Sequence, residues 1–185
     1  MAGAGGILPS VTKAPACLYP AEEIAARVRE LGRAIRDRFP GEALTLLGIL
    51  KGSAIFTADL VRAVGEPVEL SFVQARSYGE STASSGHVAL GDLEADVLKD
   101  RTVVVADTIL DTGLTLTVIL AQVRALGARE VRTCVLLDKK ERRTVEVQLD
   151  WVGFTVPDRF LVGYGLDHAG RYRALEYVGT LEDEA

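Results

Sequence analysis

The sequence predicts an α/β fold, in which a central, mainly parallel and twisted sheet is flanked by helices. Short runs of Val, Ile and Leu, typical of strands buried on both faces, alternate with segments of helical periodicity. Right-handed crossovers place the carboxyl ends of such strands on one edge of the sheet, where ligands bind. Polar segments directly follow four of the runs, so we expect them to converge on one site. These segments are residues 51–53, 77–78, 107–115 and 138–140.

The composition is that of one soluble globular domain, which we take to span residues 1–185. Apolar residues make up 48% of the chain and charged residues 25%, which suits a sizeable core. The net charge of −5 argues against a dedicated nucleic-acid binder. No apolar run approaches the roughly 20 residues that cross a bilayer. We therefore expect neither a nucleic acid nor a membrane among the partners.

The cysteines and the N-terminus indicate the compartment. Cys17 and Cys134 lie far apart and form no metal-binding spacing, which suits a reducing cytoplasm. Cys134 stands in an apolar run and is expected in the core. The N-terminus lacks the charged start and long apolar segment of a signal peptide, so a cytoplasmic location is expected. The Gly- and Ala-rich residues 1–15 are expected to be disordered.

The first helix is predicted over residues 21–39, where apolar residues recur at helical spacing. Pro20 opens this helix, two glutamates suit its positive amino end, and Pro40 and Gly41 end it. The apolar stripe that should face the sheet consists of Ile24, Val28, Leu31 and Ile35.

The remaining elements follow from the same reasoning. Residues 77–91 are rich in Ser, Gly and Thr and have little periodicity, so a mobile excursion is predicted there. Residues 139–147 form a polar segment with four clustered cations. The predicted strands are 44–50, 68–75, 101–106, 131–137, 152–154, 160–164 and a final strand region at 172–181, and a second helix covers 54–64.

The stretch from residue 103 to residue 115 organises the prediction. A β-branched run ends at Ala106, a polar loop follows, and a helix then continues to Gly127. Thr112 and Gly113 should present free backbone N–H groups at the start of that helix, which suits a phosphate. Carboxylates in the same loop would repel that phosphate, so they suit hydroxyls, a cation or a proton. A short D-T-G segment alone is equally consistent with an ordinary helix cap.

The whole stretch resembles the phosphoribosyl-pyrophosphate (PRPP) motif of the type I phosphoribosyltransferases. That motif reads four aliphatics, two acids, two aliphatics and then D-T-G-x-T, and residues 111–115 fit its second half without change. Asp107 and Thr108 stand at the acid pair, so one carboxylate is shortened and the other is lost. The resemblance implies that Asp111 is the general base. It also implies that PRPP is held by Asp107, Thr108, Thr112, Gly113, Leu114 and Thr115.

Two further segments are similar to the hypoxanthine-guanine enzymes of that family. Lys51 and Gly52 match a loop that binds pyrophosphate, in which a non-proline cis peptide precedes the lysine. Ser77 and Tyr78 match the start of a lid that closes over PRPP and excludes water from a cationic ribose transition state. Without the resemblance, Lys51 reads as a solvated turn residue and the Ser-Tyr pair as a surface loop.

The resemblance extends to a purine site near the C-terminus. Lys139 matches a lysine that reads the 6-oxo group, because an ammonium only donates hydrogen bonds and disfavours the 6-amino group of adenine. Lys140 could take this role by a shift of one residue. Phe160 matches an aromatic residue whose ring stacks on the base. Leu161 matches a residue whose backbone groups contact the edge of the base. The sequence alone would place Phe160 in the core.

The segment that follows would serve the leaving group. Asp167 matches a residue that holds the Mg²⁺ bound to pyrophosphate. Arg173 matches a residue that contacts the pyrophosphate oxygens. From the sequence alone Asp167 reads as a turn residue. His87 and His168 show no metal or nucleophile spacing and are taken as surface residues.

Together these matches, from about Pro20 onward, imply a type I phosphoribosyltransferase fold with a small hood over residues 151–185. The implied reaction is purine salvage, in which hypoxanthine or guanine and PRPP give the nucleoside monophosphate (IMP or GMP) and pyrophosphate with Mg²⁺. The incomplete acid pair predicts weak PRPP binding. The resemblance also implies a homodimer or a homotetramer. The alternatives are a phosphoribosyltransferase for xanthine or another base, and a weakly catalytic nucleotide-binding regulator.

Overall fold

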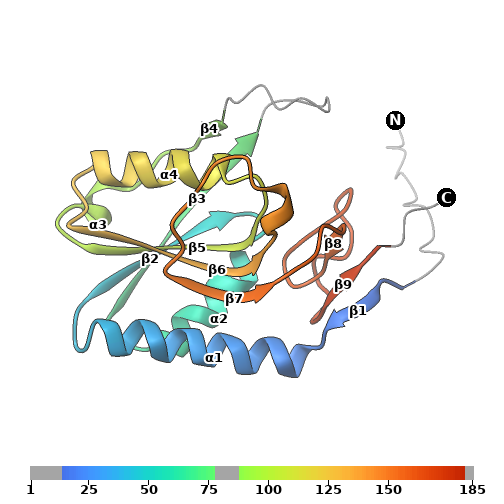
Figure 1. The fold of residues 1–185 in the computed structure, drawn as a ribbon. Coiled ribbons are helices and arrows are strands. Elements are labelled where there is room, and N and C mark those ends of the chain that lie inside the picture. The colour runs from blue at the N-terminus through green and yellow to red at the C-terminus, as the bar shows by residue number, and fades with distance from the viewer. Residues whose placement is uncertain (1–13, 78–87, 182–185) are drawn as a thin grey trace, which may run out of the picture.

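A computed structural model describes residues 14–77 and 88–181, and these build a six-stranded sheet flanked by helices (Figure 1). The strand order is β4-β3-β2-β5-β6-β7, and every neighbouring pair is parallel except β3 and β4. The fold class is therefore confirmed. The strands are β2 (Leu44–Leu50), β3 (Val68–Ser77), β4 (Val88–Leu90), β5 (Thr102–Leu110), β6 (Glu130–Asp138) and β7 (Trp151–Thr155).

Helices cover both faces of the sheet. One face is packed by α1 (Ala21–Arg38) and α2 (Ala54–Val64), and the other by α4 (Leu114–Ala125) and the short α3 (Ala95–Leu98) (Figure 1). The predicted stripe on α1 is buried along its whole length. A Cβ added to Gly32 would lie 2.5 Å from atoms of Ala63, so a bare backbone lets α1 and α2 approach closely.

The two central strands are apolar on both faces because each face carries a helical layer. Six of the seven residues of β2 are buried, and so are the first five of β5. Cys134 is fully buried in β6, as predicted. Two apolar clusters result, one on each side of the sheet.

A second, three-stranded antiparallel sheet forms the hood beside the carboxyl end of β7 (Figure 1). It joins β1 (Ala16–Tyr19), β9 (Val178–Thr180) and β8 (Leu161–Val162) in that order. Tyr19 stacks on Phe154 at 4.2 Å between ring centroids, which ties the hood to the main sheet. The predicted hood boundary at residue 151 is corrected, because β7 pairs with β6 inside the main sheet.

Three of the local predictions differ from the structure, and two short elements were not predicted. Strand β5 runs on to Leu110 instead of ending at Ala106, because β6 pairs with it along its whole length. In the excursion predicted over 77–91, residues 88–90 pair with β3 as a strand, and Tyr78 and His87 lie outside the described residues. In the region 172–181 only Val178–Thr180 is a strand, since residues 172–175 form a turn in which the N–H of Leu175 donates to the carbonyl of Tyr172 at 3.0 Å. The sequence patterns indicated neither α3 nor β1.

Within the described segments, 14–77 and 88–181, no helix combines the length and apolar character needed to cross a bilayer.

Candidate active site

Loops from neighbouring parallel strands meet at one edge of the sheet, as the sequence predicts. Strands β3, β2, β5 and β6 lie side by side, and their carboxyl ends carry Ser77 and residues 51–53, 107–115 and 138–140. The hydroxyl of Thr108 donates to the carbonyl of Gly52 at 3.1 Å. The N–H of Lys139 donates to the carbonyl of Leu110 at 3.0 Å. Three of the predicted site loops are therefore directly bonded to one another.

The loop between β5 and α4 has the form of an anion site. Gly113 precedes α4 with a φ of +93°, and a Cβ there would lie 2.6 Å from the carbonyl of Val145. Only glycine tolerates both the left-handed conformation and this close approach. The loop therefore turns directly into α4, whose first backbone N–H groups have no partner within the helix. These N–H groups belong to Leu114, Thr115 and Leu116.

The segment after β6 closes over this loop as a strap, which we define as residues 142–145. The N–H groups of Thr144 and Val145 donate to the carbonyl of Thr112 at 3.0 and 3.1 Å. The guanidinium of Arg143 donates to the carbonyl of Asp111 at 3.1 Å and forms an ion pair with buried Asp138. The sequence showed Arg143 only as one of a cluster of cations, because the carbonyl of Asp111 to which it donates lies 32 residues away along the chain.

Asp111 lies beneath the strap. The Nε atom of Arg142 is 3.3 Å from its Oδ1 atom, and this oxygen is buried without a hydrogen bond. The carboxylate as a whole remains 43% exposed, so its other oxygen can reach a ligand. Asp111 thus presents an accessible acceptor oxygen, which a group that takes up a proton needs.

Asp107 and Thr108 occupy opposite faces of β5, because successive side chains in a strand alternate. The partly buried carboxylate of Asp107 accepts the N–H of Thr108 at 2.8 Å. Burial raises the pKa of Asp107 to about 7, although the N–H groups of Thr108 and Ile109 oppose this rise. Thr108 is fully buried, and its hydroxyl is hydrogen-bonded to the carbonyl of Gly52 in the neighbouring loop.

Lys139 and Phe160 take contrasting positions on the base side. Lys139 is only 7% exposed, and its ammonium lies 3.0 Å from an oxygen of Asp158, whereas Lys140 is exposed. Phe160 is 49% exposed and lies edge-on to the exposed His168, with 5.0 Å between ring centroids. Leu161 follows as a buried residue of β8. The alternative of a core position for Phe160 is thus wrong.

The loop at Lys51 lies against the hairpin that carries Asp167 and Arg173. The Leu50–Lys51 peptide is cis, as the resemblance implied, and Lys51 is exposed. A Cβ on Gly165 would lie 2.2 Å from the carbonyl of Gly52, so the two loops touch through bare backbone. One oxygen of Asp167 lies 2.5 Å from Arg173.

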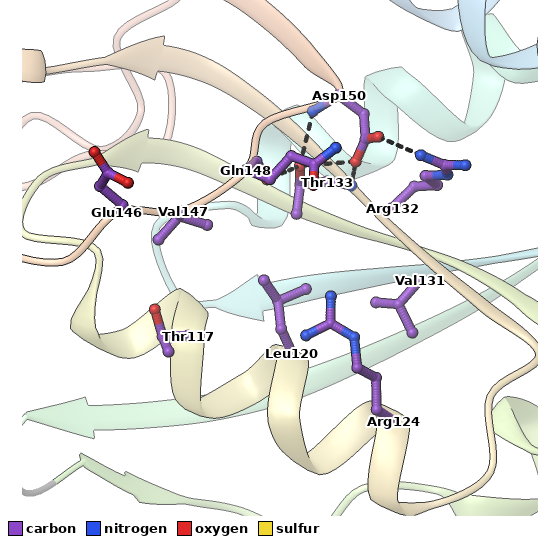
Figure 2. A pocket seen from close by; sticks show the side chains of 10 residues that line it. All are labelled: Thr117, Leu120, Arg124, Val131, Arg132, Thr133, Glu146, Val147, Gln148 and Asp150. Atoms are coloured by element: carbon purple, nitrogen blue, oxygen red, sulfur yellow. Dashed lines mark hydrogen bonds and ion pairs between the residues drawn. The ribbon is translucent and has the colours of Figure 1, made fainter.

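A separate pocket lies between α4 and the first half of β6 (Figure 2). Asp150 pairs with Arg132 at 2.8 Å and accepts the N–H of Thr133 at 2.8 Å. Thr133 also donates through its hydroxyl to the carbonyl of Gln148 at 3.0 Å, and the pocket holds none of the predicted site residues. We therefore interpret these bonded side chains as stabilising the connection between β6 and β7.

The comparison with protein families agrees with this geometry. Residues 17–169 match the family described as the phosphoribosyl transferase domain. The chain belongs to this family. It is 42% identical to the hypoxanthine-guanine phosphoribosyltransferase of Mycobacterium avium over 197 residues, which covers 97% of each chain. It is 44% identical to the hypoxanthine phosphoribosyltransferase of Salmonella typhimurium over 171 residues, 89% of this chain and 93% of the other.

Solved phosphoribosyltransferase structures share the fold. A hypoxanthine-guanine phosphoribosyltransferase from Bacillus anthracis superposes with a TM-score of 0.86 at 36% identity, covering 92% of this chain and all of the other. The hypoxanthine phosphoribosyltransferase of Trypanosoma cruzi, solved with its ternary substrates, gives a TM-score of 0.84 at 35% identity over 91% and 95% of the two chains. The type I phosphoribosyltransferase fold is therefore confirmed.

Proposed function

We propose that this protein transfers the phosphoribosyl group of PRPP to N9 of hypoxanthine or guanine, yielding IMP or GMP and pyrophosphate. The observation that carries the proposal is the bond from the N–H of Lys139 to the carbonyl of Leu110. It brings a buried donor for a 6-oxopurine next to the loop that begins at Asp111. One site can therefore hold the base and the phosphoribosyl donor together.

The phosphoribosyl half of the site is the start of α4. Backbone N–H groups and hydroxyls from Thr112, Gly113, Leu114 and Thr115 would cradle the 5′-phosphate. Asp107 would accept a hydrogen bond from a ribose hydroxyl. Thr108 would act behind it, because its hydroxyl already bonds to Gly52. The site thus has one ionisable group where the family motif has two, which supports weak PRPP binding.

The base half discriminates by donor pattern. The ammonium of Lys139 can donate to the 6-oxo group of hypoxanthine, guanine or xanthine, and it cannot accept from the 6-amino group of adenine. Phe160 has an exposed ring that can stack on the purine. Backbone groups at Leu161 would contact the edge of the base. A donor-only group facing the 6-position therefore favours 6-oxopurines over adenine.

Asp111 would take the proton from N7 as N9 attacks the ribose carbon. General-base catalysis needs an ionised carboxylate within reach of the acidic proton. The guanidinium of Arg142 lies beside one oxygen and leaves the other accessible. Arg143 holds the carbonyl of the same residue. The strap would therefore fix which carboxylate oxygen of Asp111 can accept the proton from N7.

Pyrophosphate would leave between Lys51, Gly52 and Arg173. Among the described residues no three metal-binding side chains are grouped, so an all-protein magnesium cage is not available. Mg²⁺ commonly takes one or two carboxylates together with substrate phosphates and water, and the one-third exposed Asp167 fits that role. The ion would neutralise charge that builds up on the departing pyrophosphate. Ser77 and Tyr78 stay a prediction for the lid.

A substrate panel tests the proposal. Purified protein is incubated with PRPP, Mg²⁺ and, in turn, hypoxanthine, guanine, xanthine or adenine, and pyrophosphate release is measured. We expect turnover with hypoxanthine or guanine and at least about 100-fold lower specificity for adenine. Turnover with xanthine alone would favour the other specificity, and PRPP binding without turnover would favour a regulator. Light scattering of the same sample tests the predicted dimer or tetramer.

A further inference from the structure

The ammonium of Lys139 is buried and has a carboxylate beside it. Its Nζ atom lies 3.0 Å from an oxygen of Asp158, and the lysine side chain is 9% exposed whereas that of Asp158 is 40% exposed. Lysine is almost never buried unless it is paired. Asp158 is therefore the group that holds this ammonium in place before any ligand arrives.

The backbone fixes Asp158 at this point. The N–H of Val156 donates to the carbonyl of Asp138 at 3.0 Å, which joins the turn after β7 to the end of β6. Within the turn, the N–H of Arg159 donates to the carbonyl of Pro157 at 2.9 Å. The backbone N–H of Asp158 is also 3.4 Å from a carboxylate oxygen of Glu141. The carboxylate is thus presented by a bonded turn.

We propose that Asp158 is a positioning residue for base recognition, which holds the Lys139 ammonium in the orientation that reads the 6-oxo group. This inference rests on the proposed function. An ammonium has three donors, so one can stay with Asp158 while another reaches the purine. Without the ion pair, the flexible lysine stem would have to be ordered by the base itself, which weakens binding.

The same geometry allows an opposite role, in which Asp158 competes with the base for Lys139. The two roles predict opposite changes in the Michaelis constant for hypoxanthine. In the positioning role, Asp158→Asn raises this constant about tenfold, the usual effect of losing one charge-assisted bond. Turnover and the Michaelis constant for PRPP change less than twofold, because in this role the ion pair affects only the binding of the base.

A double-mutant cycle separates positioning from mere folding. In a Lys139→Gln background, Asp158→Asn should have little further effect on the constant for hypoxanthine, because the ion pair is already absent. Asp158→Glu should restore part of the loss. Glu176→Gln removes an exposed carboxylate of the same C-terminal region and should leave all constants unchanged. Thermal melts of each variant report folding.

The outcomes are distinct. A constant for hypoxanthine that is unchanged or lower in Asp158→Asn overturns the positioning role while the proposed function stands. An equal loss of turnover, PRPP binding and melting temperature assigns Asp158 a structural role and also overturns it. Wild-type protein that turns over no 6-oxopurine refutes the proposed function and this inference with it.

Discussion

Replacing Asp107 with asparagine should stabilise the free protein, and the gain should grow with pH. The carboxyl group of Asp107 has a folded-state pKa of about 7, against an ordinary value of 3.8, because it is buried. Between these two values the folded state holds a proton that the unfolded state has released. Stability therefore falls as pH rises through that window. An asparagine does not titrate, so the variant escapes this loss.

The size of the effect follows from the shift. About three pKa units correspond to roughly 4 kcal/mol above pH 8 and to well under 1 kcal/mol at pH 4. Asp107 is only partly buried by surface area, and the amide of asparagine must find a partner of its own. We therefore expect a net gain of about 2 kcal/mol at pH 8, or a rise of about 4–8 °C in melting temperature.

The assay is a set of thermal melts of the wild type and Asp107→Asn from pH 4.5 to pH 8.5. Asp92→Asn is the control, since Asp92 is exposed and its replacement also removes one negative charge. A difference between Asp107→Asn and wild type that is constant across this range would refute the reasoning, as would a less stable variant at pH 8. The same variant should bind PRPP more weakly, because its ribose contact has lost the charge.

Three further substitutions test the site. Asp111→Asn should lower turnover about 100-fold or more with little change in PRPP affinity, and near-native turnover would exclude Asp111 as the base. Lys139→Gln should lower the preference for hypoxanthine over adenine, whereas Lys140→Gln, at an exposed position, should not; the ratio of kcat/KM values decides between them. Gly113→Ala should cost more than about 1 kcal/mol and raise KM for PRPP, because the new methyl group meets the Val145 carbonyl in a left-handed backbone; unchanged melting and KM would contradict that geometry.

Periodicity and family motifs were enough to predict the layers of the fold and the edge on which the site forms. The apolar stripe of α1 predicts a helix that packs one face on the sheet. The apolar run in β2 predicts a strand that is covered on both faces. The motif at residues 111–115 likewise predicted the loop before α4, since the backbone freedom of a glycine is enough to start a helix there. These features depend on neighbours within a few residues.

The ends of elements and the partners of charges depended on the tertiary structure. β5 reaches Leu110 only because β6 pairs with it, so Asp107 became a partly buried strand residue with a raised pKa. Asp158 and Lys139 meet across 19 residues of sequence, and no local pattern encodes that contact. An ion pair's strength and a carboxyl group's pKa are set by the burial and charges around them, and those arise only when distant segments pack together.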